Sequence, residues 1–142
     1  MVSLALLEKD VAAIYVDTSN YVNADNINLC VKNFMNDSDH KAKADRAQET
    51  LGRLRVIKIF NLDELLVLLA MILEQLRAKK LTFDLRLIVI DSLSSLFAPV
   101  PHKQHQYFQL IKELLFYFKS LNKKHFVSVV YTNNSVNDTH FT

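Results

Sequence analysis

The sequence has 142 residues, which suits one domain of ordinary size and leaves no room for two sizeable cores. Half of the residues are hydrophobic, so the chain can bury a core and does not have the composition of a disordered protein. A net charge of +2 gives no strong indication of a nucleic acid, membrane or acidic substrate as partner, and the single cysteine, Cys30, excludes an internal disulfide.

Apolar segments rich in β-branched and aromatic residues predict strands that are buried in a sheet. There are four of them, at 12–16, 54–60, 85–90 and 126–131. Lys58 interrupts the second segment, which indicates an edge strand or a solvated face.

The longer segments between the predicted strands have the spacing of helices. Asn61 is placed to cap a helix with Glu64 three residues further on, and this helix continues to Leu76. Other helices are predicted at 107–121, at 27–34, and within the polar stretch 36–53.

Alternating strands and helices predict an α/β fold with a mostly parallel sheet flanked by helices. The longest apolar run, 65–73, is far shorter than the roughly 20 residues that cross a bilayer, so no membrane association is expected.

Small polar residues follow three of the predicted strands, at 17–20, 91–92 and 132–134. In open α/β sheets the ligand crevice lies outside the carboxyl ends of the strands, so these positions form a candidate binding site. The alternative is that loops after strands are polar in any protein. The candidate residues are Asp17, Thr18, Asp91, Ser92, Asn133 and Asn134.

The segment Leu87-Ile88-Val89-Ile90-Asp91 has the form of a Walker B strand, in which a buried strand positions an aspartate near Mg²⁺. The alternative is a structural aspartate that caps the following helix, a role that Ser92 and Ser94 could also fill.

Four segments in chain order, 14–18, 51–56, 87–96 and 129–133, resemble the core of RecA-type recombinases. The similarity is greatest to the eukaryotic paralogues that assist the strand-exchange recombinase, the D-type paralogues among them. It implies that the chain is a single partial RecA-like P-loop ATPase core over 1–142.

The resemblance also implies roles for matching positions. Asp91 would hold Mg²⁺ through water, and Asp17, Thr18, Ser92, Asn133 and Asn134 would lie beside ATP. The segment 95–106 would match the first DNA-facing loop of the family, with Lys103, His102 and His105 as candidate DNA contacts.

Two departures from the family pattern concern catalysis. Ser19 stands where active members carry the glutamate that activates water, so hydrolysis by this chain is expected to be poor. Gly52, the only glycine, precedes Arg53 rather than a lysine, so the chain contains no glycine-rich phosphate loop. Leu4 to Glu8 would be the remnant of the helix after that loop, which argues against ATP binding by this chain alone.

The leading hypothesis is therefore a recombinase paralogue that acts in DNA repair by homologous recombination, in the nucleus, as part of a protein complex. The resemblance implies other paralogues or the strand-exchange recombinase as partners, with single-stranded DNA as a further ligand. One alternative is a protein–protein adaptor that retains only a degenerate ATPase scaffold. Another is an ATPase whose phosphate loop lies outside these residues, so the sequence leaves enzymatic activity undecided.

Overall fold

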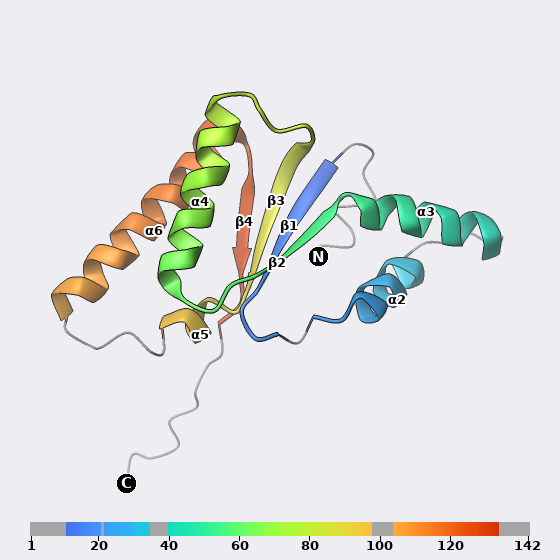
Figure 1. The fold of residues 1–142 in the computed structure, drawn as a ribbon, viewed down its shortest axis with the longest axis horizontal. Helices are drawn as coiled ribbons and strands as arrows, with labels where there is room; N and C mark the ends of the chain where they lie inside the picture. Colours follow the sequence, from blue (N-terminus) through green and yellow to red (C-terminus); the bar gives the residue numbers. More distant parts are fainter. Residues whose placement is uncertain (1–10, 21, 35–39, 98–103, 134–142) are drawn as a thin grey trace, which may run out of the picture.

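A computed structural model describes residues 11–20, 22–34, 40–97 and 104–133, which form a sheet with helices packed on it (Figure 1). The elements in chain order are β1 Val11–Asp17, α2 Ala24–Phe34, α3 His40–Gly52, β2 Leu54–Lys58, α4 Leu62–Arg77, β3 Asp84–Asp91, α5 Leu93–Phe97, α6 Gln104–His125 and β4 Ser128–Tyr131. The strands pair in the order β2-β1-β3-β4, and all of the pairings are parallel. The predicted α/β class with a parallel sheet is confirmed.

All four predicted strands are present, and two of them, β2 and β4, are shorter at one end than predicted. β2 stops at Lys58 because the chain turns into the α4 cap, and Lys58 lies on an edge strand, as its charge indicated. β4 begins at Ser128 rather than at Phe126, because α6 continues to His125. Phe126 then adopts a left-handed conformation with φ of 56° and is 74% exposed.

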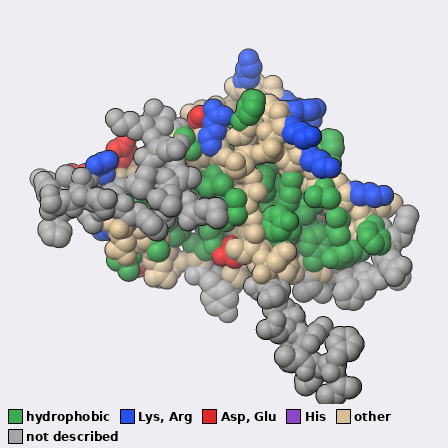
Figure 2. Space-filling model, turned by 180° about the vertical axis from the view of Figure 1, so that it is seen from behind, with side chains coloured by type: hydrophobic (Ala, Val, Ile, Leu, Met, Phe, Trp, Pro, Cys, Tyr) green, Lys and Arg blue, Asp and Glu red, His purple; other side chains and the backbone are tan. Residues whose placement is uncertain are grey.

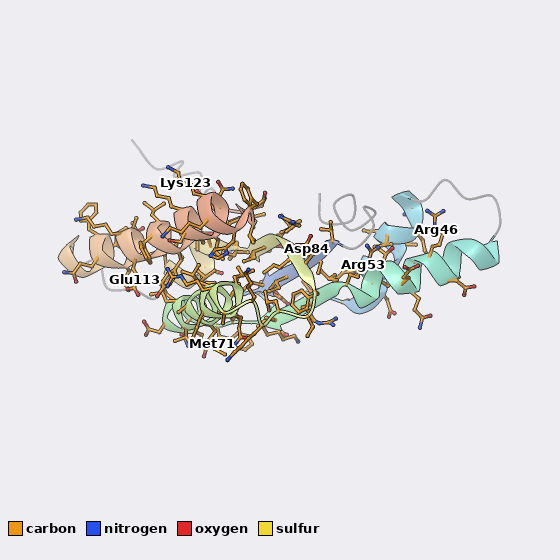
Figure 3. The ribbon with its side chains drawn as sticks, turned by 90° about the horizontal axis from the view of Figure 1, so that it is seen from above. Arg46, Arg53, Met71, Asp84, Glu113 and Lys123 are labelled. Atoms are coloured by element: carbon orange, nitrogen blue, oxygen red, sulfur yellow. The ribbon has the colours of Figure 1, made fainter. Side chains whose placement is uncertain are left out.

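The two faces of the sheet bury different sets of side chains, because side chains alternate along a strand. The larger core lies between the sheet and the pair α4 and α6, which pack against each other (Figure 3). It contains Ile14 and Val16 of β1 together with Ile88 and Ile90 of β3. On the opposite face, Ala13, Tyr15, Leu54, Leu87 and Val89 form a smaller cluster that Ile27 of α2 joins.

An irregularity at the start of β3 sets the alternation of that strand. Ala12 pairs with Leu85 but Ala13 pairs with Leu87, so Arg86 is an extra residue opposite the step between them. Leu85 and Ile88 consequently face the same core although they are three residues apart. From Leu87 onward the register is regular to the end of the strand.

The predicted cap of α4 is present. The side-chain oxygen of Asn61 accepts a hydrogen bond from the backbone N–H of Glu64 at 2.8 Å. The Glu64 carboxylate in turn accepts the backbone N–H of Phe60 at 3.1 Å and the Asn61 side-chain amide at 2.8 Å. The bond from Glu64 satisfies one of the N–H groups that the first turn of a helix leaves without partners, and the bonds to its carboxylate hold the residues that precede the helix.

With glycine at a single position, other residues occupy left-handed backbone conformations. Asn20, Lys79 and Phe126 all have positive φ. Lys79 lies just after the C-cap of α4, where its own N–H bonds to the carbonyl of Leu76 and the N–H of Lys80 bonds to that of Gln75, as in a Schellman motif. Among the helices that the structure describes, none is long and apolar enough to cross a membrane.

Replacing Asn61 with alanine should lower the free energy of unfolding by about 1 kcal/mol, because the N–H of Glu64 loses its acceptor. Urea denaturation measures this change as a lower midpoint at unchanged slope. Asn122→Ala, at an exposed position inside α6, is the matched control and should not destabilise the chain. Equal losses in the two variants would contradict the capping role.

Candidate functional site

Parallel pairing brings the carboxyl ends of β1, β3 and β4 to one edge of the sheet, here called the strand-end rim. Asp17 is the last residue of β1 and Asp91 the last residue of β3, and the register pairs them directly. Tyr131 ends β4 and pairs with Ile90, so Thr132 follows at the level of Asp91. The two aspartates that the sequence placed at strand ends therefore lie beside each other.

The carboxylate of Asp91 accepts a hydrogen bond on each of its oxygens from neighbouring strands. The hydroxyl of Tyr15, from β1, donates to Oδ2 at 2.5 Å, and the hydroxyl of Thr132, after β4, donates to Oδ1 at 2.5 Å. Burial raises the pKa of Tyr15, and the hydrogen bond and negative charge of Asp91 raise it further. The phenol therefore keeps its proton and is the donor in this pair.

Asp17 directs its side chain to the loop that follows β1. It is fully buried, and Oδ1 accepts the backbone N–H of Ser19 at 3.0 Å and its hydroxyl at 3.2 Å, while Oδ2 accepts the N–H of Val22 at 3.2 Å. Burial by itself would raise the pKa of Asp17, but the donors of Val22 and Ser19 outweigh it and lower the pKa. Asp17 is thus a charged residue that orders its own loop.

Thr18 and Ser92 join the next positions of β1 and β3. The hydroxyl of Thr18 accepts the backbone N–H of Ser92 at 2.7 Å and lies 3.0 Å from the Ser92 carbonyl, to which it donates. The hydroxyl of Ser95 lies 2.6 Å from that of Thr18 and 2.7 Å from the same carbonyl. The peptide bond between Asp91 and Ser92 is cis. Both Thr18 and Ser92 are buried. The hydroxyls of Thr18 and Ser95 therefore hold the backbone of Ser92, while the Ser92 hydroxyl accepts a hydrogen bond from that of Ser94 at 3.3 Å.

The remaining predicted residues lie elsewhere or outside the described part of the chain. Asn133 lines a groove of about 490 Å³ between α5, α6 and β4, whose other walls are mostly apolar. Asn134, Lys103 and His102 lie outside the described residues. His105 belongs to α6, but its side chain is not among those described.

Two residues that complete the rim, Tyr15 and Thr132, were not among the residues predicted for the site. Tyr15 stands two positions before Asp17, so both side chains leave the same face of β1, and the parallel register carries this face next to Asp91. Thr132 was recognised as polar but not as a partner of Asp91. The available signal was a tyrosine two residues before the aspartate that ends the strand. This signal identifies Asp91 as the partner of Tyr15 only when β1 and β3 are known to be neighbours.

Each oxygen of Asp91 already accepts one hydrogen bond from the chain, which reduces the acceptor capacity that the water shell of Mg²⁺ could use. Magnesium keeps several water ligands, and these waters donate hydrogen bonds to nearby carboxylates. Tyr15 and Thr132 already supply such donors to both oxygens of Asp91, and Asp17 is committed to its own loop. Among the residues that the structure describes, no group of three His, Cys, Asp or Glu side chains could hold a metal ion.

A comparison with models of protein families found no match for this chain, and a comparison with the sequences of curated proteins found none either. The interpretation of function therefore depends on the sequence motifs and on the geometry of the strand-end rim.

Replacing Asp17 with asparagine should lower the free energy of unfolding at neutral pH by about 1–3 kcal/mol, because the N–H groups of Ser19 and Val22 lose a charged acceptor. The folded-state pKa lies below the unfolded one, so this stability is present above about pH 4 and disappears as the pH falls through the lower folded value. Urea denaturation at successive pH values should show the gap between wild type and Asp17→Asn closing in acid.

Ser19→Ala serves as the graded control for Asp17, since it removes one hydroxyl donor and leaves the backbone N–H donors of Ser19 and Val22 in place. Its loss should be smaller than that of Asp17→Asn. A gap between wild type and Asp17→Asn that stays constant with pH would rule out the proposed charge on Asp17.

Proposed function

We propose that the chain is a RecA-like core that acts in homologous recombination as a recombinase paralogue within a protein complex, without hydrolysing ATP itself. The observation that carries this proposal is the direct pairing of Asp17 with Asp91 at the ends of adjacent parallel strands. The two residues belong to separate motifs of the sequence, 74 positions apart, and a RecA-like arrangement requires them at one rim. The adjacency of β1 and β3 in the parallel sheet brings the two aspartates together, which supports the resemblance.

The side chains at the rim favour an architectural role over hydrolysis. Ser19 has no carboxylate with which to activate water, and its hydroxyl donates to Asp17 instead. Gly52 is the only glycine in the sequence, and it ends α3, separated by one residue from the amino end of β2, at the opposite end of the sheet from the strand-end rim. Any ATP and Mg²⁺ bound in the complex would rely on phosphate-binding groups supplied by the partner.

The proposed DNA contact lies in the segment that precedes and enters α6, with Lys103, His102 and His105 as its candidate residues. Lysine neutralises phosphates and makes binding depend on salt, and histidine can add hydrogen bonds to the backbone of the strand. α6 continues this positive character with Lys112, Lys119, Lys123 and Lys124. Single-stranded DNA and a nuclear location follow from the proposed role.

A second candidate function, a protein–protein adaptor, is favoured by the exposed apolar surface of α6 and β4. Phe116 is 55% exposed on α6, and Tyr131 is 48% exposed at the end of β4. Figure 2 shows a broad hydrophobic area on the side of the molecule that faces away in Figure 1, with lysine and arginine along its border. Hydrophobic surface of this extent is typical of a protein interface.

The two edges of the sheet differ in a way that supports the same adaptor function. β2, at one edge, carries Arg55 and Lys58, and charged side chains discourage another strand from pairing. β4, at the other edge of the described sheet, has the sequence SVVY without any charge. A partner that extends the sheet would therefore add beside β4.

A measurement of single-stranded DNA binding distinguishes the recombination role from the adaptor role. Binding is measured as fluorescence anisotropy of a labelled oligonucleotide at several salt concentrations. The recombination role predicts binding that weakens with salt and drops several-fold in Lys103→Ala, because one phosphate contact is lost. Lys80→Ala, at an exposed position between α4 and β3 and outside α6, is the control for lost charge and should change affinity little. Absence of DNA binding together with binding to a recombinase would favour the adaptor.

The adaptor function predicts that Phe116→Glu weakens binding of the strand-exchange recombinase or its paralogues by at least about tenfold, because the charge enters an apolar contact. Pull-down with the purified partners and isothermal titration calorimetry measure the effect. Met71→Glu is the matched control, since Met71 is 57% exposed on α4 and points away from α6 (Figure 3). Equal weakening by the two variants would argue against an interface on α6.

A further inference from the structure

The carboxylate of Asp91 connects three strands through hydroxyl groups. Tyr15 donates to it from β1, Thr132 donates to it from the end of β4, and Asp91 itself ends β3. β3 lies between β1 and β4 in the sheet, so the contacts cross both the β1–β3 pairing and the β3–β4 pairing at the rim.

Both donors are held in position by the fold and not by the carboxylate alone. The ring of Tyr15 packs in the apolar cluster of Ala13, Leu87 and Val89, which fixes the direction of its hydroxyl. Thr132 is anchored through its backbone, where its N–H bonds to the carbonyl of Ile90 at 3.0 Å and its carbonyl accepts the N–H of Leu93 at 2.9 Å. Preorganised donors lose little entropy when they bind a charged acceptor, which makes such bonds stabilising.

The two donors present the same kind of group to Asp91 as water bound to a metal ion would. A water molecule in the shell of Mg²⁺ presents an O–H group to a carboxylate, and so do the hydroxyls of Tyr15 and Thr132. Burial and the nearby carboxylates Asp91 and Asp17 keep the phenol protonated, so it remains a donor. The negative charge of Asp91 is thereby compensated by groups of the chain itself.

We propose that the hydroxyls of Tyr15 and Thr132 stand in for metal-bound water, so that Asp91 is a metal-independent tie between β1, β3 and β4. Asp91 then stabilises the sheet and does not recruit Mg²⁺. The role holds whether or not the chain acts in recombination, and a failed DNA or partner experiment leaves it untouched. In a metal site the carboxylate is expected to depend on the metal ion, because no other group compensates its negative charge until the ion binds.

The test is thermal unfolding of the full chain in Tyr15→Phe, Asp91→Ala and the double variant, with and without millimolar MgCl₂ or MnCl₂. Tyr15→Phe should lower Tm by about 5 °C, because a hydrogen bond to a charged group is lost in a domain of this size. In the Asp91→Ala background the same substitution should have a much smaller effect, since the two residues act as a pair. Neither metal should shift the Tm of the wild type.

Tyr117→Phe, which removes a hydroxyl from α6, is the matched control and should leave Tm nearly unchanged. Two results would overturn the proposal. The first is an increase in Tm with MgCl₂ or MnCl₂ that Asp91→Ala abolishes, which would identify a metal site. The second is an effect of Tyr15→Phe that is the same with and without Asp91.

A spectroscopic measurement keeps the proposal testable if Asp91→Ala does not fold. With ¹³Cζ-labelled tyrosine, the Tyr15 resonance is assigned by its loss in Tyr15→Phe and is then followed with pH in wild type and in the conservative variant Asp91→Asn. The midpoint for ionisation of Tyr15 should fall in Asp91→Asn, because the negative charge next to the phenol is removed. An unchanged midpoint would mean that the two side chains do not interact, and the tie would be rejected.

Discussion

The pairing of β1 with β3 is the interaction on which the rest of this structure depends. These two strands form the centre of the sheet, and their parallel register fixes which side chains meet at its carboxyl end. Because parallel neighbours end at the same edge, residues that are far apart in the sequence become adjacent without any loop reaching across. The loops after β1 and β3 then close through the bonds between Thr18 and Ser92, so the sheet and the rim form one unit.

Fold class and most elements could be predicted from the sequence because both depend on local patterns. Continuous apolar runs marked the strands, and Asn61 with Glu64 marked the start of α4. The ends of elements were less accurate where tertiary structure overrides local preference. Phenylalanine is a residue type that favours strands. Because α6 continues to His125, however, Phe126 lies in the left-handed turn that ends this helix.

The candidate site was predicted only in part, for a physical reason. The polar residues after strands are visible in the sequence, whereas their partners depend on which strands are neighbours. Tyr15 looks like one more buried aromatic residue until the order β2-β1-β3-β4 places it against Asp91. The sequence also could not show that Asp17 accepts hydrogen bonds from the loop that follows it. An aspartate that binds a ligand and an aspartate that holds a turn look the same in a sequence.

The irregularity at Arg86, near the amino end of β3, determines which β3 residue stands opposite Asp17 at the carboxyl end of the sheet. Arg86 lies roughly 16 Å from Asp91 along the strand, as expected for five residues at about 3.3 Å each. If the pairing of Ala12 with Leu85 continued without the irregularity, Arg86 would pair with Ala13, every later side chain of β3 would lie on the other face, and Ile90 would stand opposite Asp17. Because Arg86 stays outside the pairing, Asp91 stands there. A single-residue deletion between Leu87 and Ile90 would instead move Asp91 opposite Val16, and so erase the acidic pair while leaving every residue of the rim present in the sequence.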